Sequence, residues 1–160
     1  MKFYLRPNHF VHRKNFNIKD EGQNNIFKIR GKFFLGFREL LMKDWNNQVL
    51  FKIHNKLGLL STKPFLISDD KGHVIATVKR VKKHFVIMVG DKEYTLKGGL
   101  ETDDLALMHE TQVLVSLSKK IFDFGETIEI DVHADKHPLM HLFIVLSVAQ
   151  MGYVKKKDSH

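Results

Sequence analysis

The sequence contains no cysteine. This absence excludes disulfide bonds, thiolate nucleophiles, zinc–thiolate sites and iron–sulfur clusters, and it is typical of a protein in a reducing cytoplasm. The N-terminal residues lack the apolar run of a signal peptide. No glycine-rich phosphate loop and no Gly-x-Ser-x-Gly elbow occurs in the chain. We therefore expect a cytoplasmic protein, and we assign it no catalytic residues, no cofactor and no enzyme activity.

The length and composition are those of one globular domain. The 160 residues are 43% hydrophobic and 28% charged, so the chain can bury a core and does not have the low hydrophobicity of a disordered protein. We expect one domain over residues 1–154, followed by a short basic tail over residues 155–160.

The net charge of +8 is concentrated in two places. Seven basic residues lie in two runs, and the other 19 are nearly balanced by 18 acidic residues. A local basic patch suggests an anionic surface or ligand, although it can also serve only to keep the protein dissolved. The two runs are Lys79, Arg80, Lys82 and Lys83, and the lysines at 155–157.

Most of the chain repeats one pattern, in which two β-rich runs flank a polar turn. Alternating apolar and polar residues within each run predict strands with one buried face, and Asn, Asp and Gly at the centres predict tight turns. The repeats lie at 16–32, 40–56, 63–80, 85–98 and 105–120. With further strands at 2–5 and 127–132, the sequence predicts about twelve antiparallel strands. A closed barrel leaves no exposed edges, and a two-sheet sandwich is the alternative.

The pattern changes only near the C-terminus, where residues 138–152 are almost all apolar. A helix of fifteen residues is about 22 Å long, whereas a bilayer core is about 30 Å thick. A helix that is apolar on every side must be surrounded, and a barrel of about twelve strands has a lumen to fill. We therefore predict a buried helix over residues 138–152 at the centre of the barrel.

Several segments resemble the LURP-one-related (LOR) family, in its small bacterial form. They are RGKFFLGFRELLMKD at 30–44, SKKIFDFGETIEIDV at 118–132, and the entry into the apolar helix. The resemblance covers nearly the whole chain. It implies the tubby C-terminal-like fold, a twelve-stranded barrel around a central C-terminal helix that is shared with tubby proteins and phospholipid scramblases. Tubby domains bind phosphoinositide headgroups through basic side chains, whereas most LOR proteins have no established activity. The sequence lacks the Pro-rich leader and Cys cluster of scramblases, which argues against lipid scrambling.

Two functions of different classes follow from these observations. In the first, a non-enzymatic domain binds anionic lipid headgroups, or another acidic ligand, at a membrane surface through Lys79, Arg80, Lys82 and Lys83. In the second, the domain is a soluble protein-interaction scaffold without a lipid role. The absence of aromatic residues between the cations argues against nucleic acid as a partner.

Ten histidines raise the question of a metal site. The best group is His133, His137 and His141 with Asp131 and Asp135, but the Glu of an HExxH motif is missing. We expect no metal, and we expect His141 to be a hydrogen-bonded histidine inside the barrel. The aromatic residues Phe33, Phe34, Phe37, Phe122 and Phe124 are expected to cover the barrel ends; an exposed patch that inserts into a bilayer or a partner is the alternative.

Overall fold

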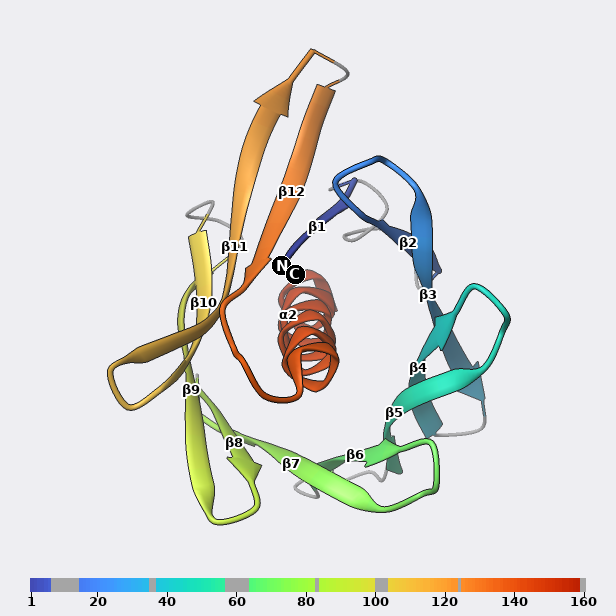
Figure 1. Cartoon of the computed structure of the whole chain (residues 1–160). Helices are drawn as coiled ribbons and strands as arrows, with labels where there is room; N and C mark the ends of the chain where they lie inside the picture. Colours follow the sequence, from blue (N-terminus) through green and yellow to red (C-terminus); the bar gives the residue numbers. More distant parts are fainter. Residues whose placement is uncertain are drawn as a thin grey trace.

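The chain folds as a closed antiparallel β-barrel with one long helix inside it (Figure 1). The structure is a computed structural model that describes residues 1–6, 15–34, 37–56, 64–82, 84–99, 104–123 and 125–158. Twelve strands follow one another around the barrel in sequence order, and β1 closes the wall by pairing with β12. The closed barrel expected from the sequence is confirmed, and the two-sheet sandwich is excluded.

The five expected hairpins are all present, as the pairs β2–β3, β4–β5, β6–β7, β8–β9 and β10–β11. The strands are β1 (Lys2–Leu5), β2 (Phe16–Lys19), β3 (Asn25–Phe34), β4 (Phe37–Asp44), β5 (Val49–Lys56), β6 (Phe65–Asp69), β7 (Val74–Val81), β8 (His84–Val89), β9 (Lys92–Gly99), β10 (Asp104–His109), β11 (Gln112–Phe122) and β12 (Gly125–Val132). The helix is α2 (Pro138–Asp158).

The alternation within each strand divides the wall into an inner and an outer face. In β1, Phe3 and Leu5 are buried and pair with buried Ile130 and Ile128 of β12. Tyr4, between them, lies on the outer face because successive side chains of a strand point to opposite sides. The inner face therefore forms the core, and polar side chains lie on the outside.

Three of the tight turns are built in the same way, around an aspartate. Asp44 Oδ1 accepts hydrogen bonds from the backbone N–H groups of Asn46 and Gln48, each at 2.9 Å. Asp69 Oδ1 accepts from Lys71 at 3.0 Å and His73 at 2.9 Å. In the turn between β2 and β3, Asp20 accepts from Asn24 at 3.0 Å. An acceptor at this position stabilises a turn, which explains why Asp recurs there.

The topology places these turns at one end of the barrel. Because neighbouring strands are antiparallel, every connection after an even-numbered strand lies at one rim and every connection after an odd-numbered strand lies at the other. We call the first end the acidic rim; its described carboxylates are Asp20, Glu21, Asp44, Asp69, Asp70, Asp91, Glu110 and Asp135, and its described cations are the N-terminal ammonium, Lys2, Lys19, Lys71, Lys92 and Lys136.

The opposite end is called the basic rim. Its described cations are Arg6, Lys79, Arg80, Lys82, Lys119 and Lys120, and its described carboxylates are Asp104, Asp123 and Glu126. Over these described residues, the two ends of the barrel therefore differ in the sign of their net charge.

The helix α2 fills the lumen, as Figure 1 shows in a view along the barrel. Leu142, Phe143, Ile144, Val145 and Leu146 lie on all sides of the helix, and each is fully buried. Barrel side chains meet them; for example, the ring of Phe51 stacks on Phe143 at 5.8 Å between centroids. The hydroxyl of Ser147, also buried, donates to the carbonyl of Phe143 at 2.7 Å. The buried central helix predicted from the sequence is confirmed.

The predicted end of the helix is wrong, because α2 continues past residue 152 to Asp158. A glycine inside a helix costs only about 1 kcal/mol, and lysines in the last turns suit the negative end of the helix dipole. The lysines at 155–157 thus belong to α2 and not to a separate tail. Within the described parts of the chain, no helix is long and apolar enough to cross a membrane.

We predict that Val145→Asp unfolds the protein or lowers its free energy of unfolding by several kcal/mol, because a buried carboxylate without a partner is strongly unfavourable. Urea denaturation followed by circular dichroism measures the effect. The matched control is Val74→Asp, since Val74 is 54% exposed. A Val145→Asp protein as stable as the Val74→Asp protein would contradict a helix at the centre of the barrel.

Candidate functional site

The basic run predicted as a binding site lies at the end of β7, on the basic rim. Lys79, Arg80 and Lys82 are exposed, whereas Lys83 lies outside the described residues. The Arg80 guanidinium is held by the turn: its Nε donates to the carbonyl of Lys82 at 3.2 Å, and its Cζ lies 5.9 Å from the ring centroid of Phe85. In the described part of the chain, Lys79 and Lys82 form no ion pair.

The alternation of β7 separates these adjacent cations. Lys79 and Arg80 are consecutive residues of one strand, so their side chains leave the sheet on opposite faces. Arg80 shares its face with Phe85, its partner on β8. Lys79 and Lys82 thus remain available to an anion, and Arg80 stabilises the turn.

A second basic segment at the same rim was missed by the sequence analysis. The hairpin of β11 and β12 projects beyond the rest of the barrel, at the top of Figure 1. Near its tip, Lys119 and Lys120 precede Ile121, whose side chain is 89% exposed. The neighbouring Phe122 packs its ring edge against Tyr4 at 6.1 Å, on the outer wall, and does not cover the barrel end as expected. The other four aromatic side chains of that prediction are not described.

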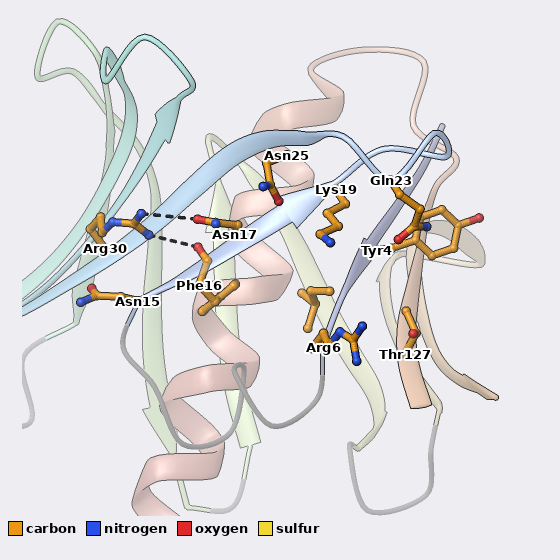
Figure 2. Close-up of a pocket in the computed structure, with 11 residues that line it drawn as sticks. Tyr4, Arg6, Asn15, Phe16, Asn17, Lys19, Gln23, Asn25, Arg30 and Thr127 are labelled. Carbon is orange, nitrogen blue, oxygen red and sulfur yellow. Dashed lines mark hydrogen bonds between the residues drawn. The ribbon is translucent and has the colours of Figure 1, made fainter. Parts of the chain in front are cut away.

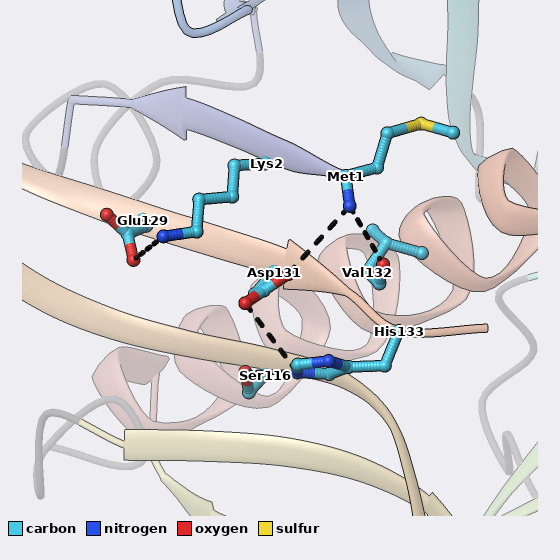
Figure 3. A network of polar contacts seen from close by, with 7 residues as sticks. All are labelled: Met1, Lys2, Ser116, Glu129, Asp131, Val132 and His133. Atoms are coloured by element: carbon cyan, nitrogen blue, oxygen red, sulfur yellow. Dashed lines mark hydrogen bonds and ion pairs between the residues drawn. The ribbon is translucent and has the colours of Figure 1, made fainter.

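The acidic rim carries its charge for structural reasons. Burial alone raises the pKa of Asp69, but the hydrogen bonds from the backbone N–H groups of His73 and Lys71 lower the pKa below its usual value. Near the same rim, the N-terminal ammonium lies 3.2 Å from the carbonyl of Val132 and 4.0 Å from Asp131, as Figure 3 shows. These contacts fasten β1 to β12 and give the Asp131 carboxylate a cationic partner.

A pocket of about 470 Å³ lies on the outer wall where β1, β2 and β3 meet (Figure 2). Its described polar lining combines three cations, four amides and two hydroxyl groups, and none of the described lining residues is acidic. The cations are Arg6, Lys19 and Arg30, the amides are Asn15, Asn17, Gln23 and Asn25, and the hydroxyl groups belong to Tyr4 and Thr127. Because the three cations are far apart in the sequence and form no local motif, sequence reasoning did not find them.

The guanidinium of Arg30 has a fixed orientation at one end of the pocket. Its Nη1 donates to the carbonyls of Ile29 at 2.8 Å and Phe16 at 3.3 Å, and its Nη2 donates to Asn17 Oδ1 at 3.4 Å. These acceptors are neutral, so they orient the guanidinium and leave its charge uncompensated.

Lys19 and Arg6 occupy the middle of the pocket. In Figure 2 their cationic groups extend into the same space from opposite sides. Within the described residues neither side chain has a hydrogen-bond or ion-pair partner. Burial raises the pKa of Tyr4, and the Glu129 carboxylate raises it further, so the Tyr4 hydroxyl keeps its proton at neutral pH. The pocket therefore presents hydrogen-bond donors and positive charge.

The structure separates the histidines and aspartates that were weighed as metal ligands. His133 lies on the outside, 3.8 Å from Asp131 and 3.4 Å from the Ser116 hydroxyl. His141 lies inside the barrel, where its Nδ1 is 2.9 Å from the carbonyl of His137 and its Nε2 is 3.1 Å from the Tyr94 hydroxyl. Among the described residues, no group of three or more such ligands could hold a metal ion.

The hydrogen bonds of His141 fix its protonation state. Nδ1 must carry the proton to donate to a carbonyl, so Nε2 accepts from the tyrosine. Burial lowers the pKa of His141 below its usual value, and the side chain is neutral at pH 7. The prediction of a hydrogen-bonded core histidine is confirmed.

The closed twelve-stranded antiparallel barrel around a C-terminal helix is the class of fold that the resemblance to the LOR family implied. The LURP-one-related (LOR) family model matches residues 1–149, and the chain belongs to this family. The uncharacterized protein YxjI of Bacillus subtilis (strain 168) is 25% identical over an alignment 162 residues long, which covers 99% of this chain and 98% of that protein.

The fold is also similar to a solved structure, that of the Arabidopsis thaliana protein AT5G01750. The TM-score is 0.58 at 15% sequence identity, and the match covers 91% of this chain and 90% of that chain. At this identity the similarity shows the fold alone. Neither relative's name states an activity, so any functional inference must come from the chemistry of the barrel surface.

We predict that the free energy of unfolding falls as the pH drops below about 6.5, with a contribution from His141. In that range the unfolded chain takes up a proton that the buried His141 excludes, so this stability is present above about pH 6.5 and is lost toward the folded-state pKa. The contribution is at most about 1.4 kcal/mol per pH unit. Urea denaturation at several pH values between about 5 and 8 measures the effect. The free energy of unfolding should change less steeply with pH for His141→Gln than for the exposed control His84→Gln. Equal slopes for the two variants would contradict a neutral buried His141.

Proposed function

We propose that this LOR domain is a non-enzymatic module that binds an anionic membrane surface through its basic rim. The observation that carries the proposal is the separation of charge between the two ends of the barrel. A molecule with one acidic and one basic end has a preferred orientation in the field of a charged surface. The basic rim would face the membrane, and the acidic rim would face away from it.

The chemistry of the two rims supports this orientation. On the acidic rim, turn aspartates such as Asp44 and Asp69 accept backbone hydrogen bonds, so their charge serves the fold. On the basic rim, Lys79 and Lys82 have no carboxylate partner among the described residues. Each cation near an anionic leaflet contributes about 1 kcal/mol of attraction.

Apolar side chains on the same rim support a membrane more than a soluble anion. Ile121 is 89% exposed near the tip of the projecting hairpin, and Val81, the last residue of β7, is 44% exposed beside Lys82. Aliphatic side chains beside lysines are typical of proteins that rest at the membrane interface. The proposed location is thus the cytoplasm, with peripheral attachment to the membrane and no contribution from the buried α2.

The first test compares two variants that lose the same three positive charges. Lys79, Lys82 and Lys120 are replaced by Gln on the basic rim, and Lys71, Lys92 and Lys136 are replaced by Gln on the acidic rim; all six are exposed. Arg80 is kept because it holds the turn. Binding to vesicles of phosphatidylcholine, with and without phosphatidylglycerol or a phosphoinositide, is measured by co-sedimentation.

We expect the basic-rim variant to bind anionic vesicles at least about tenfold more weakly than the native chain, since three cations together are worth about 3 kcal/mol. The acidic-rim variant should bind anionic vesicles at least about tenfold more tightly than the basic-rim variant does. Equal losses in the two variants, or equal binding of the native chain to neutral and anionic vesicles, would sink the proposal and leave the soluble protein-interaction scaffold as the better hypothesis.

A second test concerns the apolar tip. We predict that Ile121→Ser weakens vesicle binding roughly fivefold, because about 1 kcal/mol is a typical gain for an aliphatic side chain that is partly removed from water. The thermal stability should not change, since the side chain is already exposed. Val74→Ser on the acidic rim is the control, and its vesicle binding should equal that of the native chain. Unchanged binding of Ile121→Ser would exclude insertion of the hairpin.

A further inference from the structure

We infer that the pocket between β1, β2 and β3 is a binding site for a small phosphate ester whose organic part carries hydroxyl groups. The pocket lies on the side wall of the barrel, so this inference does not depend on the proposed function of the basic rim. A phosphorylated sugar or polyol in solution and a glycerol-phosphate lipid headgroup share this chemistry.

The pocket exists because the barrel wall is weakest at this point. β1 and β2 share a single aligned pair, Tyr4 with Lys19. The adjoining pair β1–β12 has four aligned residues on β1, and a register shift follows Ile18 where β2 pairs with β3. Beyond Tyr4 and Lys19 the two strands diverge, and the wall opens as far as the buried residues Leu5 and Phe16. The gap between β1 and β2 makes a concave pocket in the barrel wall, and small-molecule ligands bind preferentially in concave pockets.

The charge of the lining selects an anion. Arg6, Lys19 and Arg30 face one cavity whose described lining has no carboxylate, so the three cations repel one another. Lys19 is half-buried and lacks a described partner, which makes its uncompensated charge less favourable than that of a fully exposed lysine. Two described acidic groups on this wall already have partners: Glu129 lies 3.7 Å from Lys2 and acts on the Tyr4 hydroxyl, and Asp20 accepts a hydrogen bond within its turn. An anion in the pocket would relieve the repulsion.

The geometry favours phosphate over a carboxylate. A phosphate monoester carries about two negative charges and three acceptor oxygens, which match more than one cation at a time. Arginine presents a planar fork of donors that binds phosphate oxygens in pairs. Arg30 is already oriented by its hydrogen bonds to Ile29 and Phe16, so little conformational entropy is lost when it binds.

The size and the remaining lining indicate what the phosphate is attached to. The volume of about 470 Å³ is much larger than an inorganic ion requires and falls within the range of small-ligand sites. Asn15, Asn17, Gln23 and Asn25 contribute amide donors and acceptors to the lining. The Oδ1 atoms of Asn15 and Asn17 already accept from Gly31 and Arg30, so their amide N–H groups and the amides of Gln23 and Asn25 are what the pocket offers to the hydroxyl groups of a ligand. The lining offers few apolar surfaces for a large aromatic ring. A sugar phosphate or a glycerol phosphate fits this description best.

Isothermal titration calorimetry tests the inference with pairs of compounds that differ only in the phosphate. The probes are glucose 6-phosphate with glucose and glycerol 3-phosphate with glycerol, and inorganic phosphate is a separate arm. The variants are Lys19→Gln in the pocket and Lys43→Gln, an equal loss of charge on β4 outside the pocket lining. Lys19 is chosen because, unlike Arg30, it makes no hydrogen bond to the described fold, and thermal melting verifies that both variants are folded.

At least one phosphorylated probe should bind with a dissociation constant below about 1 mM, and its dephosphorylated partner should bind at least about tenfold more weakly. Lys19→Gln should weaken binding of the phosphorylated probe at least about tenfold, and Lys43→Gln should leave it within about twofold of the native value. If neither phosphorylated probe binds, or if Lys19→Gln and Lys43→Gln bind equally, the inference is overturned.

A vesicle arm distinguishes a soluble ligand from a lipid headgroup. If the headgroup occupies the pocket, Lys19→Gln will bind anionic vesicles more weakly than Lys43→Gln does, and glycerol 3-phosphate will compete with the vesicles. If the ligand is soluble, the two variants will bind vesicles equally while only Lys19→Gln loses the probe. The basic-rim variant should keep the calorimetric binding, so failure of the rim proposal and failure of the pocket proposal give different results.

Discussion

The structure depends on one physical constraint, which is that a barrel of twelve strands encloses a space that must be filled. The helix α2 fills it with side chains that are apolar on every side, and residues such as Phe143 and Val145 are completely buried. The surrounding strands in turn shield from water a helix that has no polar face. Because the described side chains of α2 in the lumen are packed against the strands, the groups that we consider for ligand binding lie on the outer wall and on the two rims. The interior holds hydrogen-bonded polar groups such as His141, which stabilise the core.

Much of this fold could be predicted from the sequence, because it follows from local patterns. Alternation identified the strands, Asp and Gly identified the turns, and an all-apolar segment identified the central helix. The end of that helix could not be predicted, since Gly152 is a weak stop signal and α2 continues to Asp158. The signs of the two rims were also hidden, because they depend on which connections the topology brings together.

The candidate sites illustrate the same limit. Lys79 and Arg80 are adjacent in the sequence, yet the strand sends them to opposite faces and the turn occupies Arg80. Arg6, Lys19 and Arg30 are distant in the sequence, yet the divergence of β1 from β2 brings them to one pocket. Cations that are adjacent in the sequence therefore do not by themselves form a binding site, and the cations of a binding site need not be adjacent in the sequence. Membership in the LOR family defines the fold, and the distribution of charge over the outer surface is what suggests a role.

The most direct measurement of the proposed role asks which end of the barrel meets a membrane. Because the chain has no cysteine, a polarity-sensitive fluorophore can be attached to a single cysteine at Val81→Cys on the basic rim or Val74→Cys on the acidic rim; both positions are exposed, at 44% and 54%. With anionic vesicles, the emission of the probe at position 81 should shift to the blue, and that of the probe at position 74 should not change. Equal shifts at the two positions, or a shift only at position 74, would contradict the account.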